Sequence, residues 1–334
     1  MVLGSKSTNL WGVFQLKGKD QSNIRGNLSD NSIVAGEKMV GEDLLSVSVI
    51  GLGNMGSALA EAFAKIGHPT TVWNRSAAKT APLIAMGAVH ADSIEDAISA
   101  SKLVITCITT YDATIQAMEP AGVGLSGRTL ITLNSGTPEG ARKMAAWVTG
   151  HGARFLDGAV KNVPAAIGKP DTLLYYSGDK ATFDEYETTL KVLGGDTVYL
   201  GGEPDLAKLY EFAVGGTLLP ALIGFFQGAA LVKGRGLQVS SLVPYSIKWL
   251  EMIGSVLPSF AEEIDAGDYT KPSSSVDIFH ESIVYDLEVG EEANIDVTWR
   301  APMHDLLRRA VATGHRDHSI SSLVELLRKS EQLE

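Results

Sequence analysis

From residue 46 onward, short runs of β-branched residues alternate with longer Ala-rich runs in which apolar positions recur at helical spacing. Such alternation is typical of parallel strands joined by crossover helices. It predicts a doubly wound α/β domain built on a parallel sheet. The predicted strands are residues 46–51, 70–74, 103–108, 129–134, 154–159, 172–177 and 197–200.

After residue 202 the strand pattern stops, and the rest of the chain has a helical period. The first predicted helix covers residues 205–233, with Pro204 ahead of its first turn and Gly234 just past its end. We expect Pro220 to kink this helix, because proline lacks the N–H that a helix interior requires. The second half of the chain is therefore predicted to be a helical domain.

Residues 212–232 carry no charge over a length that could cross a bilayer. The stretch contains Pro220, Gln227 and several glycines, and it stands alone inside an otherwise globular pattern. We therefore expect a buried central helix and no membrane span. A helix this apolar needs cover on all sides, and we expect a partner subunit to supply part of that cover.

The chain has 334 residues, of which 45% are hydrophobic, and this suits two domains with a core each. We expect a flexible arm over residues 1–44, where Ser, Asn, Gly and Lys dominate. An α/β domain is predicted over residues 45–203, and a helical domain over residues 204–334.

The 39 acidic and 28 basic residues give a net charge of −11 without a basic block, so the protein repels nucleic acid and anionic membrane surfaces. Cys107 is the only cysteine, which excludes an intrachain disulfide and a cysteine-built zinc site. No clustered spacing of His and carboxylate residues indicates a metal site either. These features predict a soluble cytoplasmic protein with neither a metal nor a nucleic-acid partner.

The first predicted strand runs directly into Gly51-Leu-Gly53-Asn-Met-Gly56, and a helix follows. This is the dinucleotide fingerprint in its usual setting. Gly51 allows the tight turn, Gly53 lets the pyrophosphate approach the backbone, and Gly56 allows the helix to pack closely on the strand. The free N–H groups of the helix face the phosphates.

The second predicted strand ends where an NAD enzyme would place an acidic residue against the ribose hydroxyls. Here it ends in Asn74-Arg75-Ser76, with Lys79 one turn on and no carboxylate beside them in the sequence. A guanidinium can bind a 2′-phosphate through charge-assisted hydrogen bonds. NADPH is therefore favoured over NADH, and the alternative is that Arg75 is a solvated loop charge.

Further cofactor contacts are expected after the strand 103–108, where Thr109 and Thr110 would line the nicotinamide side. The segment 133–139 ends a strand and opens a helix at the carboxyl edge of the sheet, where Asn134 and Ser135 could bind cofactor or substrate or, alternatively, cap the helix. The full set of predicted cofactor contacts is Gly51, Leu52, Gly53, Asn54, Met55, Gly56, Asn74, Arg75, Ser76, Lys79, Cys107, Ile108, Thr109, Thr110, Thr114, Asn134 and Ser135.

These motifs, with the Ser-Gly-Thr-Pro-Glu segment at 135–139 and an all-helical second half, resemble the β-hydroxyacid dehydrogenase superfamily from about residue 46 to the end. Hydroxyacid dehydrogenases of that group use a lysine, with an asparagine one turn later, at the start of the long interdomain helix. In this chain Lys208 is followed four residues on by Phe212, so that pair is missing.

The helix instead resembles that of imine reductases and reductive aminases, whose aligned position carries Asp or Tyr and here holds Glu211, with Tyr210 beside it. Residues 157–168 and 264–269 are similar to two other segments of that branch, and Trp249 is in register. The resemblance implies hydride transfer from NADPH to a cyclic imine or iminium, giving an amine. It also implies a homodimer with exchanged helical domains. In such a dimer, residues 45–203 would be the NADP-binding Rossmann domain and residues 204–334 the helical substrate and dimerisation domain.

The chemistry of an imine reductase needs a proton source or an anion beside the nitrogen, because hydride adds readily to C=N only when nitrogen is positively charged. Glu211 could supply either, and Tyr210 is the alternative donor. Consecutive residues on a helix point about 100° apart, so both could face one pocket only at its edges. The alternative for Glu211 is an ordinary helix charge paired with Lys208.

The substrate wall is expected to include Ser135, Leu219, Trp249, Asp277, Phe279 and His280. Leu219 stands where reductive aminases often carry Tyr, and Phe279 where some have Gln, so the substrate range stays open. Trp249 could simply be core, and His280 a structural histidine.

Two other functions remain possible from the sequence alone. One is a hydroxyacid dehydrogenase or aldehyde reductase of the same superfamily, and the missing lysine weighs against it. The other is a non-catalytic NADPH-binding protein.

Overall fold

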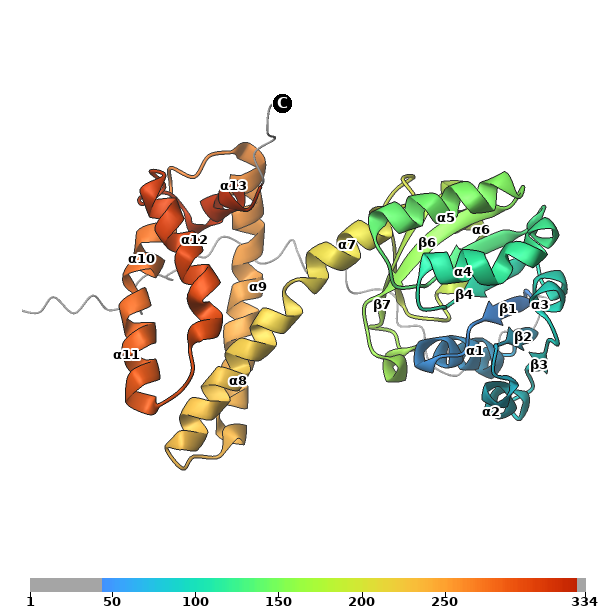
Figure 1. Ribbon diagram of the computed structural model, residues 1–334, viewed down its shortest axis with the longest axis horizontal. Coiled ribbons are helices and arrows are strands. Elements are labelled where there is room, and N and C mark those ends of the chain that lie inside the picture. Colours follow the sequence, from blue (N-terminus) through green and yellow to red (C-terminus); the bar gives the residue numbers. More distant parts are fainter. Residues whose placement is uncertain (1–43, 329–334) are drawn as a thin grey trace, which may run out of the picture. The chain divides into compact units, whose positions relative to one another are not determined.

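The computed structural model describes residues 44–328, which form two compact units, 44–218 and 219–328 (Figure 1). The predicted flexible arm, residues 1–44, lies outside the described residues except for Leu44. The first unit has the expected Rossmann architecture and the second is helical, so the predicted fold class is confirmed.

The first unit is built on one sheet with the strand order β3-β2-β1-β4-β5-β6-β7-β8. All seven predicted strands are present, and the sequence analysis missed the two-residue strand β3. The strands are β1 (Val47–Ile50), β2 (Thr70–Trp73), β3 (Val89–His90), β4 (Leu103–Thr106), β5 (Thr129–Thr132), β6 (Arg154–Val160), β7 (Leu173–Gly178) and β8 (Asp196–Tyr199).

The expectation of a wholly parallel sheet is wrong at one pair, because β7 runs antiparallel to β6. A parallel neighbour needs a crossover, usually through an α-helix. The connection over residues 161–172 contains only the single 3₁₀ turn Pro164–Ala166, and Pro170 follows it. The chain therefore returns alongside β6 in the opposite direction.

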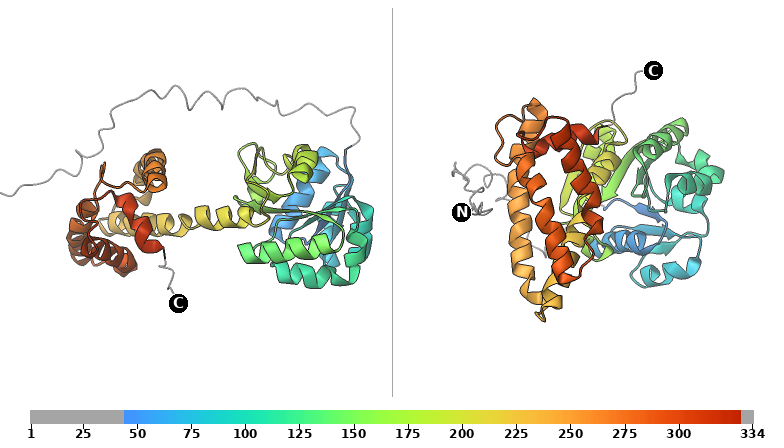
Figure 2. Two further views of the ribbon diagram at one scale, coloured as in Figure 1. Left: turned by 90° about the horizontal axis from the view of Figure 1, so that it is seen from above. Right: turned by 60° about the vertical axis from the view of Figure 1, so that its left-hand side comes forward.

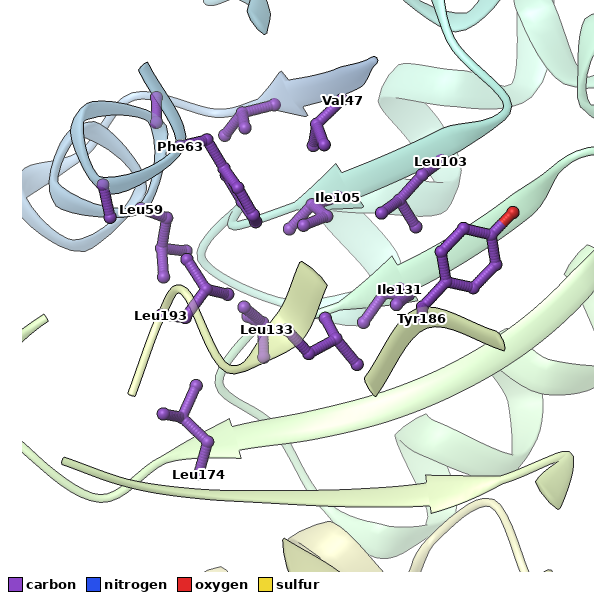
Figure 3. Close-up of a cluster of buried hydrophobic side chains, with 14 of the residues drawn as sticks. Val47, Leu59, Phe63, Leu103, Ile105, Ile131, Leu133, Leu174, Tyr186 and Leu193 are labelled. Carbon is purple, nitrogen blue, oxygen red and sulfur yellow. The ribbon is translucent and has the colours of Figure 1, made fainter. Parts of the chain in front are cut away.

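Helices cover both faces of the sheet, as Figure 2 shows. On one face, α1 (Asn54–Ile66) and α6 (Lys180–Leu190) contribute buried apolar side chains to a core that includes Val47, Ile105 and Leu174 (Figure 3). On the other face, α3 (Ile94–Ala100), α4 (Tyr111–Met118) and α5 (Pro138–Gly150) form a second core. A short helix, α2 (Ala81–Ile84), follows the 3₁₀ turn Ala77–Thr80. Because helices cover both faces of the sheet, a ligand can reach it only at its edges.

The predicted helix 205–233 is two helices, α7 (Leu206–Gly215) and α8 (Leu218–Gly234), with a turn at residues 216–217. The predicted kink near Pro220 is present as this break between the two helices, and it has a local cause. Proline has no N–H for the carbonyl of residue 216, and its ring clashes with that carbonyl. The helix is therefore interrupted one turn before the proline, and α7 packs on β6 and β7.

The helical unit contains α8 and the five helices α9 (Val243–Ala266), α10 (Val276–Glu281), α11 (Ile283–Ala293), α12 (Ala301–Ala312) and α13 (Leu323–Leu327). A polar cluster connects three of its helices. Asp286 of α11 accepts from Arg300 and lies 3.1 Å from His304 Nε2, while Gln227 Oε1 of α8 accepts from Trp299 at 2.7 Å and Arg300 at 3.1 Å.

The apolar helix α8 has no buried residue in the described chain, so the prediction of a buried central helix is wrong for this chain alone. Its exposed side chains include Leu218, Leu222 and Phe226, each at least 41% exposed. By length and composition, Leu206–Gly234 is the one helix among residues 44–328 that could cross a membrane. The helices of the unit itself do not surround α8, so its apolar surface needs another cover.

Candidate active site

A pocket of about 970 Å³ opens at the carboxyl ends of β1, β2 and β4. The strand order reverses between β1 and β4, and this is where open α/β sheets bind their ligands. Ten of the predicted cofactor contacts line the pocket: Gly51, Leu52, Gly53, Asn74, Arg75, Ser76, Lys79, Cys107, Ile108 and Thr109. Their contact with a dinucleotide stays a prediction.

The glycines of the first turn have the properties that a dinucleotide site requires. Gly51 has φ +97°, and a Cβ there would lie 2.6 Å from the Cys107 carbonyl oxygen; a Cβ on Gly56 would lie 1.9 Å from the Gly51 carbonyl oxygen. A Cβ on Gly53 would meet nothing within 4 Å. Gly53 is also the N-cap of α1 and has no side chain to occupy the helix N–H groups. These residues fit a pyrophosphate held against the helix N-terminus.

The charged residues of the pocket are of both signs. Arg75 and Lys79 lie in the 3₁₀ turn region after β2, where the sequence analysis placed them. Asp92 and Glu95 also line the pocket, and the sequence analysis missed them because they follow β3, which it did not predict. The expectation that no carboxylate lies near Arg75 does not hold for the pocket as a whole. The preference for a 2′-phosphate stays a prediction, resting on two cations that share their pocket with two carboxylates.

Asn134 does not cap a helix. Its Oδ1 accepts from Ile108 N–H at 3.0 Å, and its Nδ2 donates to Thr114 Oγ1 at 2.7 Å. Thr137 is the cap of α5, since its side chain accepts from Gly140 N–H. Asn134 is thus a buried support for the pocket wall. Ser135 beside it is exposed.

The remaining predicted cofactor residues are not in the pocket wall. Thr110 caps α4 through its side chain, and Asn54, Met55 and Gly56 form the first turn of α1. The thiol of Cys107 lines the pocket, and burial raises its pKa to about 11. It is therefore neutral at physiological pH and unsuited to nucleophilic chemistry.

A buried polar cluster lies where α7 packs on β6, next to the segment that follows β5. Lys208 of α7 is fully buried, and its Nζ donates to the carbonyl oxygens of Asn134 at 2.6 Å and Gly158 at 2.8 Å. The same Nζ lies 3.0 Å from Glu211 Oε2. The pairing of Lys208 with Glu211 that the sequence left open is present. Because Lys208 is inaccessible, it cannot act as the substrate-contacting lysine of a hydroxyacid dehydrogenase.

Asp157 is the second carboxylate of this cluster. Its Oδ1 accepts from Tyr111 Oη at 2.6 Å and Thr132 Oγ1 at 2.7 Å, and its Oδ2 has no partner among residues 44–328. Burial raises the pKa of Asp157 to about 6, although the Lys208 charge and the two hydrogen bonds oppose this rise. Burial and the neighbouring Asp157 also raise the pKa of Tyr111 far above its usual value.

Neither Asp157 nor Tyr111 was predicted as a site residue. Asp157 is the only charged residue in the buried part of β6, since Arg154 at the start of the strand is exposed, and a charge among apolar strand residues could have indicated a polar site. Tyr111 could not have been found this way, since its burial depends on Gly136 and Gly140. A Cβ on either glycine would lie within 2.6 Å of the Tyr111 ring.

Glu211 and Tyr210 point in different directions, as the 100° step of a helix requires. Glu211 turns toward Lys208, and 28% of its side chain is exposed. Tyr210 packs edge-on against Tyr175 of β7, with the ring centroids 6.2 Å apart, and it is 46% exposed. Only Glu211 joins the polar cluster, so it is the better candidate for chemistry.

Comparisons with known proteins agree with this architecture. Residues 46–201 match the NAD binding domain of 6-phosphogluconate dehydrogenase, and residues 203–329 match the NADPH-dependent reductive aminase-like C-terminal domain. An NADPH-dependent reductive aminase of Aspergillus oryzae is 32% identical over 86% of this chain and 99% of its own length. The chain belongs to the imine reductase and reductive aminase family.

Solved structures of family members extend over nearly the same length. An imine reductase of Streptomyces aurantiacus has a TM-score of 0.81 at 34% identity, covering 85% of this chain and 100% of its own. A reductive aminase of Aspergillus terreus, in complex with NADPH and ethyl-5-oxohexanoate, has a TM-score of 0.79 at 34% identity and the same coverage. Membership of the family makes this chain an NAD(P)-binding oxidoreductase.

Five of the predicted substrate-wall residues belong to the helical unit. Leu219, Trp249 and Phe279 are 62%, 56% and 36% exposed, so the alternative that Trp249 is a core residue does not hold within the described chain. Asp277 forms an ion pair with Arg316, and His280 lines a shallow pocket of about 610 Å³. Their contact with substrate stays a prediction.

The raised pKa of Asp157 gives a testable pH dependence. Its carboxyl group binds a proton more tightly in the folded state than at its ordinary value of 3.8. The contribution of Asp157 to the free energy of unfolding is therefore largest at low pH, and it is lost as pH rises through about 6. We expect the difference in free energy of unfolding between wild type and Asp157→Asn to fall by up to about 1.4 kcal/mol per pH unit over this interval.

Denaturant unfolding at several pH values measures this difference. Asp179→Asn is the matched control, because hydrogen bonds from Thr182 lower the pKa of Asp179 below its ordinary value of 3.8. The contribution of Asp179 is therefore lost only as pH falls through that lower range, and it should stay nearly constant between pH 4 and 6. A difference for Asp157→Asn that does not change from pH 4 to 6 would contradict the assignment.

Proposed function

We propose that the protein is an NADPH-dependent imine reductase that transfers hydride to a cyclic imine or iminium and releases the amine. The observation that carries the proposal is the partly exposed carboxylate of Glu211, held by a buried lysine beside the carboxyl edge of a dinucleotide-binding sheet. Reductive amination, in which the imine forms from a carbonyl compound and an amine, is an extension of the same proposal. The names of the relatives support both activities.

The bound dinucleotide would supply the hydride. The turn at Gly51 and Gly53 would hold its pyrophosphate, and Arg75 and Lys79 would hold a 2′-phosphate. Asn134 fixes the backbone of Ile108, which also lines the pocket. These residues orient the cofactor and take no part in bond making.

Glu211 would act on the nitrogen of the substrate. A carboxylate beside C=N can stabilise the cation that accepts hydride, or its acid form can donate a proton to a neutral imine. Tyr210 packs on Tyr175 and is proposed as part of the wall.

The two rival functions have less support. A hydroxyacid dehydrogenase needs a lysine that reaches the substrate, and Lys208 has no exposed surface. The buried charges of Lys208 and Asp157 carry a desolvation penalty, and NADPH binding alone does not explain why a protein would keep them.

Substitution of Glu211 tests the proposal. We expect Glu211→Gln to lower kcat/KM with NADPH and 2-methyl-1-pyrroline on the order of 10²–10⁴-fold, because the variant has neither the anion nor the acid. Tyr210→Phe, the adjacent control, should retain most of the rate. Steady-state NADPH oxidation measures both. Equal losses in the two variants, or none in Glu211→Gln, would remove Glu211 from the mechanism.

Substitution of Arg75 tests the cofactor assignment. A hydrogen bond to a charged group contributes about 1.5–3 kcal/mol, so Arg75→Ala should weaken NADPH binding roughly 10- to 100-fold and leave NADH binding nearly unchanged. Fluorescence titration with each dinucleotide measures the two affinities. If both change by the same factor, Arg75 does not bind the 2′-phosphate.

We further propose that the protein is a homodimer with exchanged helical domains in the cytoplasm. The uncovered apolar face of α8 supports the dimer, because soluble monomers rarely expose so much apolar surface. Light scattering after size exclusion should give twice the 35.4 kDa chain mass, and Phe226→Glu on α8 should reduce it. A monomer, or a chain that is soluble only in detergent, would contradict this proposal.

A further inference from the structure

Tyr111 is the first residue of α4, shortly after the pocket-lining residues 107–109, and its side chain is buried. Its ring packs against two residues that have no side chain. A Cβ on Gly136 would lie 2.5 Å from the ring, and a Cβ on Gly140 would lie 2.6 Å from it. Gly136 follows β5, and Gly140 lies in the first turn of α5. Tyr111 therefore packs the start of α4 tightly against the segment that connects β5 to α5.

The hydroxyl group at the other end of the ring is fixed as well. It donates to Asp157 Oδ1 at 2.6 Å, and the same oxygen accepts from Thr132 Oγ1 at 2.7 Å. Burial and the neighbouring Asp157 raise the pKa of Tyr111 far above its usual value, so the hydroxyl keeps its proton and stays a donor. Breaking this bond would leave a buried hydroxyl without a partner, which is costly. The ring of Tyr111 is thus held from both sides.

Asn134 connects the same two segments in the opposite direction. From the end of β5, its side chain accepts from Ile108 N–H at 3.0 Å and donates to Thr114 Oγ1 at 2.7 Å. Residues 107–109 line the cofactor pocket, and the segment after β5 contains the exposed Ser135, a candidate for the substrate wall. Because Asn134 and Tyr111 both join these segments, the spacing between the two walls depends on their hydrogen bonds.

We propose that Tyr111, held by Asp157, is a positioning residue for hydride transfer, because it sets the spacing between the pocket residues 107–109 and the segment 135–140. The inference rests on the proposed function. In that step a hydride leaves the reduced dinucleotide and bonds to the carbon of the protonated C=N group, whose π electron pair moves to nitrogen to give the neutral amine. A displacement of about 1 Å can slow such a reaction on the order of 10²-fold.

A matched pair of variants separates positioning from stability. Tyr111→Phe and Thr132→Val each remove one buried hydrogen bond to the same oxygen of Asp157, but only Tyr111 packs on the two glycines. We expect similar losses of thermal stability in the two variants. We expect Tyr111→Phe to lower kcat for 2-methyl-1-pyrroline about tenfold or more and to change KM less than about threefold, whereas Thr132→Val should keep kcat within about twofold of wild type.

Single-turnover oxidation of NADPH measures the hydride step itself, and deuterium at C4 of the nicotinamide identifies that step by slowing it. The single-turnover rate should fall in Tyr111→Phe by the same factor as kcat. Equal decreases in Tyr111→Phe and Thr132→Val, or no decrease in Tyr111→Phe, would overturn the proposal.

Variants of Asp157 test the other end of the hydrogen bond. Asp157→Asn keeps an acceptor oxygen for Tyr111 and Asp157→Ala does not, so the single-turnover rate should be higher in Asp157→Asn. Thermal melting establishes which variants are folded. If Tyr111→Phe does not fold, this second pair decides the question, and equal rates in the two Asp157 variants would contradict the positioning role.

The fluorescence anisotropy decay of bound NADPH is a readout that does not depend on turnover. We expect the nicotinamide to be more mobile in Tyr111→Phe than in Thr132→Val, with NADPH affinity in both within about threefold of wild type. If wild type reduces no imine, the proposed function fails and this comparison decides the inference, which equal mobility would overturn. If wild type reduces the imine and the two variants behave alike, the inference fails and the proposed function stands.

Discussion

The buried ammonium of Lys208 joins the elements on which the proposed site depends. Through the carbonyl oxygens of Asn134 and Gly158 it connects the ends of β5 and β6, and through Glu211 it fixes a carboxylate on α7. Any break in this arrangement would leave a charge or a carbonyl group without a partner in the interior, which is costly. The position of α7 on the sheet and the geometry of Glu211 are therefore set by the same contacts.

The cofactor pocket does not depend on the contacts of Lys208. It depends on the reversal of strand order between β1 and β4 and on glycines that leave no side chain at the turn. Asn134 connects the two parts of the site, because its side chain supports Ile108 in the pocket while its carbonyl oxygen accepts from Lys208. One residue thus supports both the pocket and the Lys208–Glu211 pair.

Much of this could be predicted from the sequence, because it depends on local patterns. The strands, the glycine turn and the residues after β2 follow from periodicity and spacing. The antiparallel β7 and the role of Asp157 could not be predicted, because they depend on which segments meet in three dimensions. The pairing of Lys208 with Glu211 was visible as a three-residue spacing, but its complete burial was not. The exposure of α8 could not be predicted for a similar reason. An apolar sequence pattern indicates that a helix is buried, but it does not show whether the same chain or another chain buries it.

The proposed reaction, transfer of hydride to the carbon of a C=N bond, can be followed by the mass of the amine formed from 2-methyl-1-pyrroline with NADPH fully deuterated at C4 of the nicotinamide. If hydride adds to the imine carbon, the product is 2-methylpyrrolidine that carries deuterium at that carbon. Unlabelled or absent amine, together with deuterium in an alcohol formed from a carbonyl compound, would contradict it.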